Sequence, residues 1–151
     1  MAKYITSTDQ NLALNGVIPF DIVSIPCNRG CVIPLAPGVL TLKGDGTNRF
    51  ARYEVKVQGN VSIPDGGAVT PIAVAITLNG TPVADSVAIL TPAAVGDVWH
   101  VNTSTTITVP CGCCVSVSAA YVDGTEDDAN VVPTPSINVR RLASLTVTRV
   151  A

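Results

Sequence analysis

The sequence of 151 residues predicts one all-β domain, a jelly-roll β-sandwich of about eight to ten short strands. Helical signals are nearly absent, because 12 glycines and 11 prolines interrupt the runs in which apolar residues would recur at helical spacing. The apolar residues are mainly Val, Ala, Ile and Leu, with few aromatics. Turn clusters such as residues 44–46 and 64–67 separate short strand-like runs. These observations together favour a sandwich.

The strand-like runs follow one another along most of the chain. We expect strands at residues 17–23, 39–43, 50–57, 71–78, a short one from 81, then 87–90, 97–102, 105–109, 115–122 and a long run at 137–150. In residues 50–57, Tyr53, Val55 and Val57 alternate with charged residues, which is typical of a strand with one buried face. Asn79-Gly80 predicts a hairpin turn. Residues 1–15 are polar and weakly patterned, so we expect an arm that precedes a domain of residues 16–151.

The charge content is unusually low for a soluble domain. Charged residues make up 13% of the chain, with a formal net charge of −2, against about 25% in average soluble domains. A surface with so few charges is best explained by contacts with other copies of the chain or with a partner. Residues 71–78 are apolar on both faces of the expected strand, which also suggests that something covers the outer face.

Composition argues against two classes of partner. The longest charge-free stretches, residues 66–84 and 98–122, contain Pro, Gly, Asn and Ser/Thr residues and do not form a membrane-spanning helix. The first ten residues lack the apolar run of a secretory signal, so we expect synthesis in a cytosol. A slightly negative chain also gives no electrostatic reason to bind nucleic acid or an anionic membrane.

The sequence offers no catalytic constellation. His100 is the only histidine, which excludes the histidine cluster of a cupin-like metalloenzyme. Its nearest acid, Asp97, falls on the opposite face of an extended strand. Motifs for phosphate loops, nucleophile elbows and zinc proteases are missing. We therefore predict a protein that is not an enzyme, with no catalytic, cofactor-binding or metal-binding residues.

The five cysteines leave three alternatives open. Cys27 and Cys31 flank a tight turn and form a disulfide if the turn brings their α-carbons within about 7 Å. A zinc site with the later cluster Cys111, Cys113 and Cys114 is the second alternative, but the spacing of that cluster fits zinc poorly. An odd count in a cytosolically made protein favours the third, mostly reduced and buried thiols.

Two clusters of charged residues do not indicate a specific binding site. The run of residues 123–128 contains four acidic side chains. A calcium loop is one interpretation, but the EF-hand spacing is absent and a solvated loop is favoured. The pair Arg140-Arg141 is too small for a nucleic-acid patch and suits an interface or a salt bridge.

Several segments resemble one group of proteins. They are residues 13–20, 51–57 followed by 59–61, 71–76 leading to Asn79-Gly80, 90–95, 109–114 and 149–151. Together they are similar to small structural proteins of phages and prophages with a jelly roll of the C1q and tumour-necrosis-factor class. The resemblance covers most of residues 13–122 and the C-terminal end, and residues 123–137 match less clearly.

The resemblance implies a virion protein that assembles as a homotrimer. It would be made in the cytoplasm of a bacterial host and would decorate the capsid or form the head of a head fibre, with residues 1–15 contacting the major capsid protein. Candidate trimer contacts are the apolar side chains Ile72, Val74, Ile76, Val115, Val117 and Tyr121. The alternative function is a receptor- or carbohydrate-binding module of a fibre or tail, although aromatic residues for stacking sugars make up only 4% of the chain.

Overall fold

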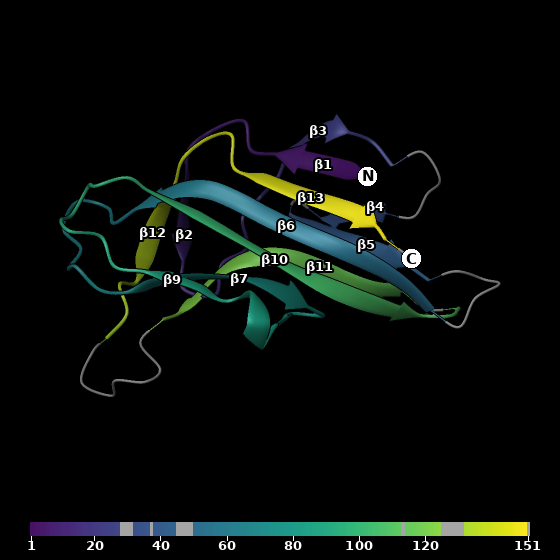
Figure 1. The fold of residues 1–151 in the computed structure, drawn as a ribbon. Coiled ribbons are helices and arrows are strands. Elements are labelled where there is room, and N and C mark those ends of the chain that lie inside the picture. Colours follow the sequence, from purple (N-terminus) through teal and green to yellow (C-terminus); the bar gives the residue numbers. More distant parts are fainter. Residues whose placement is uncertain (28–31, 37, 45–49, 113, 125–131, 151) are drawn as a thin grey trace.

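The protein folds into two antiparallel β-sheets that pack face to face (Figure 1). The structure, a computed structural model, describes residues 1–27, 32–36, 38–44, 50–112, 114–124 and 132–150. The first sheet contains β1 (Ala2–Ile5), β2 (Gln10–Ala13), β3 (Ile22–Ile25), β6 (Phe50–Ser62), β10 (Trp99–Pro110), β12 (Ser136–Val139) and β13 (Ser144–Arg149). The second contains β4 (Val32–Ala36), β5 (Val39–Lys43), β7 (Ile72–Leu78), β8 (Thr81–Pro82), β9 (Ala88–Leu90) and β11 (Cys114–Asp123). A short 3-10 turn, η1 (Ala84–Ser86), precedes β9.

The strand order is that of a jelly roll. Strands β1, β13, β6 and β10 lie side by side in the first sheet, and β5, β11, β7 and β9 lie side by side in the second. The chain therefore passes repeatedly from one sheet to the other, and its first and last main strands are neighbours. This is the eight-strand, double Greek-key arrangement. The predicted all-β jelly roll is confirmed, and β2, β3, β4, β8 and β12 are additions to it.

The core lies between the sheets and follows the predicted alternation. In β6, Tyr53 and Val55 are fully buried, whereas Arg52 and Lys56 point to solvent. Full burial of an aliphatic side chain contributes about 1.5–3 kcal/mol relative to exposure. The hydroxyl of Tyr53 donates a hydrogen bond to the carbonyl of Lys43, 2.6 Å away, which ties the first sheet to the end of β5.

Residues 1–15 are part of the sandwich and do not form the expected arm. Strand β1 pairs with β13 on one side and β3 on the other, and it buries Ala2 and Tyr4. Strand β2 pairs with β12 and buries Leu12. Each strand has only four residues, too few for their alternation to stand out among the polar residues around them. The domain therefore includes the segment predicted to precede it.

Two expected strands on β10 are a single strand. Residues 97–102 and 105–109 were expected as separate elements, but Trp99–Pro110 pairs with β6 without interruption. The hydroxyls of Thr103 and Thr105 donate to the carbonyl of Ser86 and the carboxylate of Asp85, at 2.6 and 2.9 Å. These contacts hold the polar middle of the strand against η1.

The expected run 137–150 is divided by a turn. Leu142 has a positive φ of 67°, a conformation that ends an extended strand. The backbone N–H groups of Leu142 and Ala143 donate to the carbonyl and hydroxyl oxygens of Thr6, at 3.0 and 3.1 Å. This turn separates β12 from β13. Its contacts with Thr6 and Asp9 of the N-terminal segment, and a bond from the N–H of Arg140 to the carbonyl of Asn60 at 2.8 Å, stabilise it.

Most of the expected strand 17–23 is irregular. Val17 makes an isolated bridge to Ala120, and the chain resumes strand pairing only at β3. The carbonyl of Ile18 lies so close to Gly38 that a Cβ there would sit 2.0 Å from its oxygen. Gly38 also has a φ of +80°, so this close approach requires a glycine. The segment therefore runs beside β11, and only its last two residues belong to a strand.

Candidate functional site

The predicted trimer contacts lie in the interior of the sandwich. Five of the six are buried in the core, namely Ile72, Val74, Ile76, Val117 and Tyr121. Val115 is half-buried at the border of the core. Alternation identified a face shared by these residues, but that face points toward the first sheet. They are therefore not the surface through which a second copy makes contact.

The outer face of β7 is covered within the chain. Ala73 and Ala75 have no solvent-exposed surface, and they pack with Ala120, Val122 and the partly buried Val87. This small second cluster explains why residues 71–78 are apolar on both faces. A partner is not needed to account for that pattern.

One end of the sandwich presents exposed apolar side chains. These are Val69, Val95, Val98, Trp99 and Val132, together called the apolar end below. The connections of residues 63–71, 91–98 and 132–135 meet there (Figure 1). The N–H of Gly96 donates to the carbonyl of Ile63 at 3.1 Å, and the N–H of Thr134 donates to the hydroxyl of Thr70 at 3.2 Å. Sequence reasoning missed this surface, because its residues come from separate loops.

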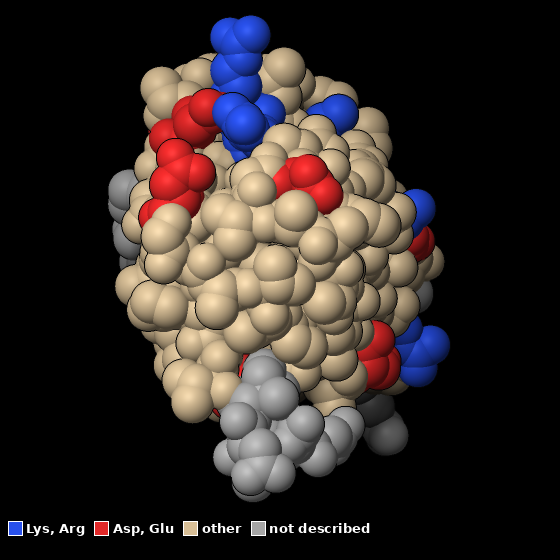
Figure 2. Space-filling view, turned by 90° about the vertical axis from the view of Figure 1, so that its left-hand side faces the viewer, with Lys and Arg blue, Asp and Glu red and all other residues tan. Residues whose placement is uncertain are grey.

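The apolar end is poor in charge. Figure 2 shows this end of the molecule as a broad uncharged area, with most acidic and basic side chains gathered toward its edges. Asp65 and Asp97 are the acidic residues of its loops, and residues 63–71 and 91–98 contain no Lys or Arg. An exposed surface that combines Val, Trp and few charges is typical of a contact with another macromolecule.

A groove crosses the outer face of the second sheet. It consists of two hollows of about 430 and 270 Å³ that share Pro82 and Val122. The remaining lining residues are Asn15, Val17, Thr77, Gly80, Ala84, Val87, Ile89, Ser118, Ala120, Asp123 and Gly124. Many of these lining residues have small side chains, and others come from β8, η1 and β9. Ile89 is 60% exposed at its rim.

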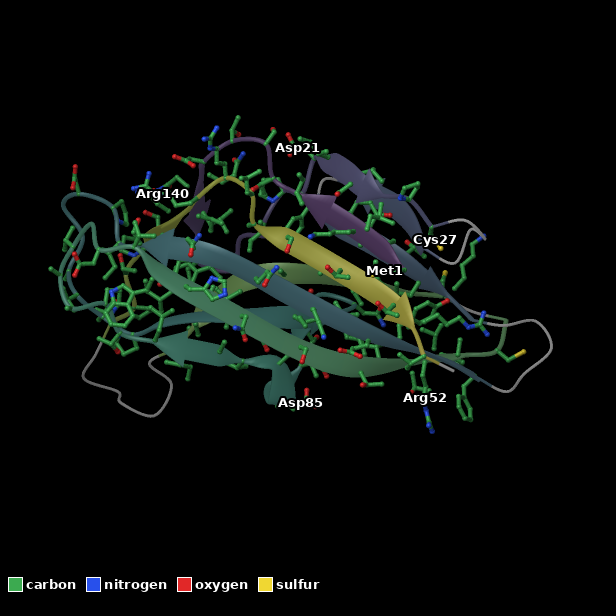
Figure 3. The ribbon with its side chains drawn as sticks, turned by 45° about the horizontal axis from the view of Figure 1, so that its top comes forward. Met1, Asp21, Cys27, Arg52, Asp85 and Arg140 are labelled. Carbon is green, nitrogen blue, oxygen red and sulfur yellow. The ribbon has the colours of Figure 1, made fainter. Side chains whose placement is uncertain are left out.

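The outer face of the first sheet is polar. It faces the viewer in Figure 3, where β13, β6 and β10 run side by side. Its exposed polar residues on β6 and β10 are Arg52, Lys56, Gln58, Asn60, His100, Asn102, Ser104, Thr106 and Thr108. A hollow of about 330 Å³ opens on this face, between β6, β10 and β13.

The structure does not assemble a catalytic centre around His100. The Nδ1 atom of His100 lies 3.3 Å from the Oδ1 atom of Asn60 on the neighbouring strand. Asp97 precedes β10, and its N–H donates to the carbonyl of Ala94 in a turn. Among the described residues, no three His, Cys, Asp or Glu side chains are grouped as metal ligands. Residues 125–128 of the acidic run lie outside the described residues.

The described cysteines lie at the end of the sandwich opposite Arg140. Figure 3 shows Cys27 and Arg140 at opposite ends. Cys27 is disulfide-bonded, while Cys111 and Cys114 are exposed thiols beside the turn between β10 and β11. Cys31 lies outside the described residues, so the pairing of Cys27 with Cys31 stays a prediction.

Two aspartates anchor the N-terminal strands. Asp9 accepts a hydrogen bond from the backbone N–H of Arg141 at 2.7 Å, and Asp21 accepts bonds from the hydroxyl and N–H of Ser7. These hydrogen bonds lower the pKa of both carboxyl groups, and the nearby Arg140 guanidinium adds to the effect at Asp9. Since the folded-state pKa values are depressed, the anchors are intact above the ordinary Asp pKa and are lost as the pH falls through the lowered values.

Tyr121 is a buried ionisable group whose pKa the fold raises. Its hydroxyl donates to the carbonyl of Thr134 at 2.7 Å. Burial, with a smaller contribution from the charge of Asp123, raises the pKa of Tyr121 from 10.0 to about 12. The fold thus favours the neutral phenol. The stability contributed by the neutral phenol is complete below pH 10 and is lost as the pH rises through about 12.

We expect Tyr121→Phe to weaken this alkaline loss of stability. The midpoint of urea unfolding, measured at about pH 9 and about pH 11.5, should fall less between the two values in Tyr121→Phe than in the unchanged protein. At the lower pH the variant should be less stable by about 1–3 kcal/mol, because the buried Thr134 carbonyl loses its donor. If both proteins lose the same stability between the two pH values, the raised pKa of Tyr121 is not the cause of the alkaline loss.

No helix in the described part of the chain is long and apolar enough to cross a membrane.

Comparison with known proteins yields structural likeness only. No protein-family model matches the chain, and no curated protein sequence matches it. The globular domain of zebrafish complement 1qA protein is similar with a TM-score of 0.48 and 9% identity, over 99% of this chain and 96% of that one. The sugar-binding EclA C-terminal domain has a TM-score of 0.38 and 11% identity, over 94% of this chain and 79% of that one. Because these likenesses are weak, we base the jelly-roll assignment on strand order and pairing.

Proposed function

We propose that this chain is a structural protein of a bacteriophage virion, which assembles as a trimer and decorates the capsid. The low charge content and the exposed apolar end support a protein that works through contacts with other macromolecules. The location in a virion is inferred from the segments that resemble phage structural proteins. Among the described residues, no three His, Cys, Asp or Glu side chains are grouped together, and His100 contacts Asn60 rather than an acid.

The apolar end carries this proposal. Val98 and Trp99 are 49% and 44% exposed; Val98 ends the connection that leads into β10, and Trp99 is the first residue of that strand. Placing such side chains against a protein shell would remove apolar area from water, which contributes about 25 cal/mol per Å². We therefore propose the apolar end as the shell contact, in place of residues 1–15, whose strands belong to the sandwich.

The oligomeric state is tested by light scattering on the purified full chain. A trimer gives a mass near three times 15.5 kDa. A stable monomer would contradict self-association, and the contact of the apolar end with the shell would then be tested by itself.

Attachment is tested by sedimenting the protein with empty capsids of the phage that encodes it. We expect the double variant Val69→Glu/Val98→Glu to reduce the bound fraction by about tenfold or more, since each charge must be desolvated in the contact. Thr106→Glu/Thr108→Glu on the polar face is the matched control and should bind normally. Equal binding by both double variants would overturn the apolar end as the contact, and no binding by the unchanged protein would overturn the decorating role.

A further inference from the structure

The hollow on the outer face of the first sheet is lined by side chains that form a compact polar patch. Its lining residues are Lys56, Val57, Gln58, Asn102, Thr103, Ser104 and Thr146. They come from three adjacent strands, β6, β10 and β13, which are distant in sequence. The patch exists only because these strands pair in this order.

The register places the polar groups opposite one another. Gln58 on β6 faces Asn102 on β10, and Lys56 faces Ser104 on β10 and Thr146 on β13. Directly opposite residues in an antiparallel pair have Cβ atoms about 4.5–5.5 Å apart. Two amides, two hydroxyls and one ammonium group are thereby concentrated on neighbouring positions of one face.

Most of these groups have unused hydrogen-bonding capacity. No hydrogen bond among the described residues involves the side chains of Gln58, Asn102, Ser104 or Thr146. The adjacent pair differs, because the Nδ1 of His100 and the Oδ1 of Asn60 already contact each other at 3.3 Å. Asn11 and Asn138 on β2 and β12 also differ from the hollow, because the side-chain amide of Asn11 donates to the Oδ1 of Asn138 at 2.9 Å. The hollow therefore concentrates donors and acceptors that remain available to a ligand.

The chemistry of the patch suits a saccharide. Each amide offers donors and an acceptor, and each hydroxyl acts as either, which matches the mixed donors and acceptors of sugar hydroxyl groups. Lys56 is partly neutralised by Glu54, whose Oε1 lies 3.0 Å from its Nζ, so the patch does not select strongly for an anion. A volume of about 330 Å³ is at the small end of ligand sites.

We propose that this hollow binds one or two rings of a saccharide. No aromatic ring lines it, so hydrogen bonds alone hold the sugar and the expected affinity is in the millimolar range. The proposal goes beyond the capsid role and does not depend on it. Saccharide binding is measured on the purified protein, whereas decoration is measured on capsids.

The side-chain amide signals of Gln58 and Asn102 provide a direct test by NMR. The ¹⁵N-labelled full chain is titrated with chitobiose, lactose, maltose and glucuronic acid at millimolar concentrations, and the two signals are identified by their loss in Gln58→Ala and Asn102→Ala. We expect at least one of these saccharides to shift both signals, while the amide signals of Asn11 and Asn138 stay in place.

Variants establish whether the hollow is the site. Gln58→Ala/Asn102→Ala should weaken binding of that saccharide by about tenfold or more, since it removes the hydrogen bonds of two amides. Thr106→Ala/Thr108→Ala, on the same face of β10 but outside the hollow, should bind unchanged. All four positions are exposed, and the thermal unfolding of each variant confirms that it folds. The proposal is overturned if none of the four saccharides shifts the two signals, or if the two double variants bind equally.

Discussion

Deleting residues 2–12 should abolish folding of the domain. The deletion removes β1, which fills the position between β13 and β3, and most of β2, the partner of β12. It also takes away the buried Tyr4 and Leu12 and the oxygens of Thr6 that hold the turn before β13. Domains of this size are stable by only about 5–15 kcal/mol, and the loss of a strand that is paired on both sides exceeds that margin.

Circular dichroism and thermal unfolding of the truncated chain measure this effect. A point variant keeps the test informative if the truncated chain cannot be purified. Tyr4→Ala should cost about 3–5 kcal/mol of unfolding free energy, because it leaves a large cavity in the core. Lys3→Ala, the next residue on the opposite face, should change stability by less than about 0.5 kcal/mol. A truncated chain with a cooperative, unchanged melting transition would show that the N-terminal strands are dispensable, as an arm would be.

Ile76→Ala should destabilise the fold without changing its assembly. Ile76 lies in the middle of β7, is fully buried, and belongs to the core between the sheets. Truncating a buried isoleucine costs about 2–5 kcal/mol, through lost burial and the cavity left behind. The mass of the folded protein should stay the same, since this side chain does not reach the outer surface.

Ile89→Ala is the matched control for that prediction. Ile89 lies on the neighbouring strand β9 and is 60% exposed, so its truncation should change stability by no more than about 0.5 kcal/mol. Urea unfolding and light scattering on both variants complete the test. A lower mass for Ile76→Ala with unchanged stability would return this face of β7 to the role of an oligomer contact.

The elements predicted correctly from the sequence are those with a clear two-residue period. Strand β5 has the expected bounds, and β6 alternates as predicted, with Tyr53 inside and Lys56 outside. Elements that depend on distant partners were harder to predict. The turn at Leu142 depends on Thr6, and the length of β10 depends on its pairing with β6 and its contacts with η1. Local pattern carries no information about such contacts.

The candidate surfaces, too, depend on residues that are distant in the sequence. Low charge indicates that part of the surface makes contacts, but it does not say which part. The apolar end is assembled from three loops and the first residue of β10. The polar hollow is assembled from strands whose residues are more than 40 positions apart along the chain, as in the pairs Gln58–Asn102 and Lys56–Thr146. Neither arrangement leaves a motif in the sequence.

By itself, the sequence determined the all-β class and the alternation of the main strands, and its single histidine excluded a histidine cluster within one chain. The tertiary structure alone decided which face of each strand is inside, that residues 2–13 contribute strands, and that Gln58 lies beside Asn102. The physical reason is that a two-residue period only divides a strand into two faces. Which face is buried depends on the strands that pair and pack against it, and in a jelly roll these come from distant parts of the chain.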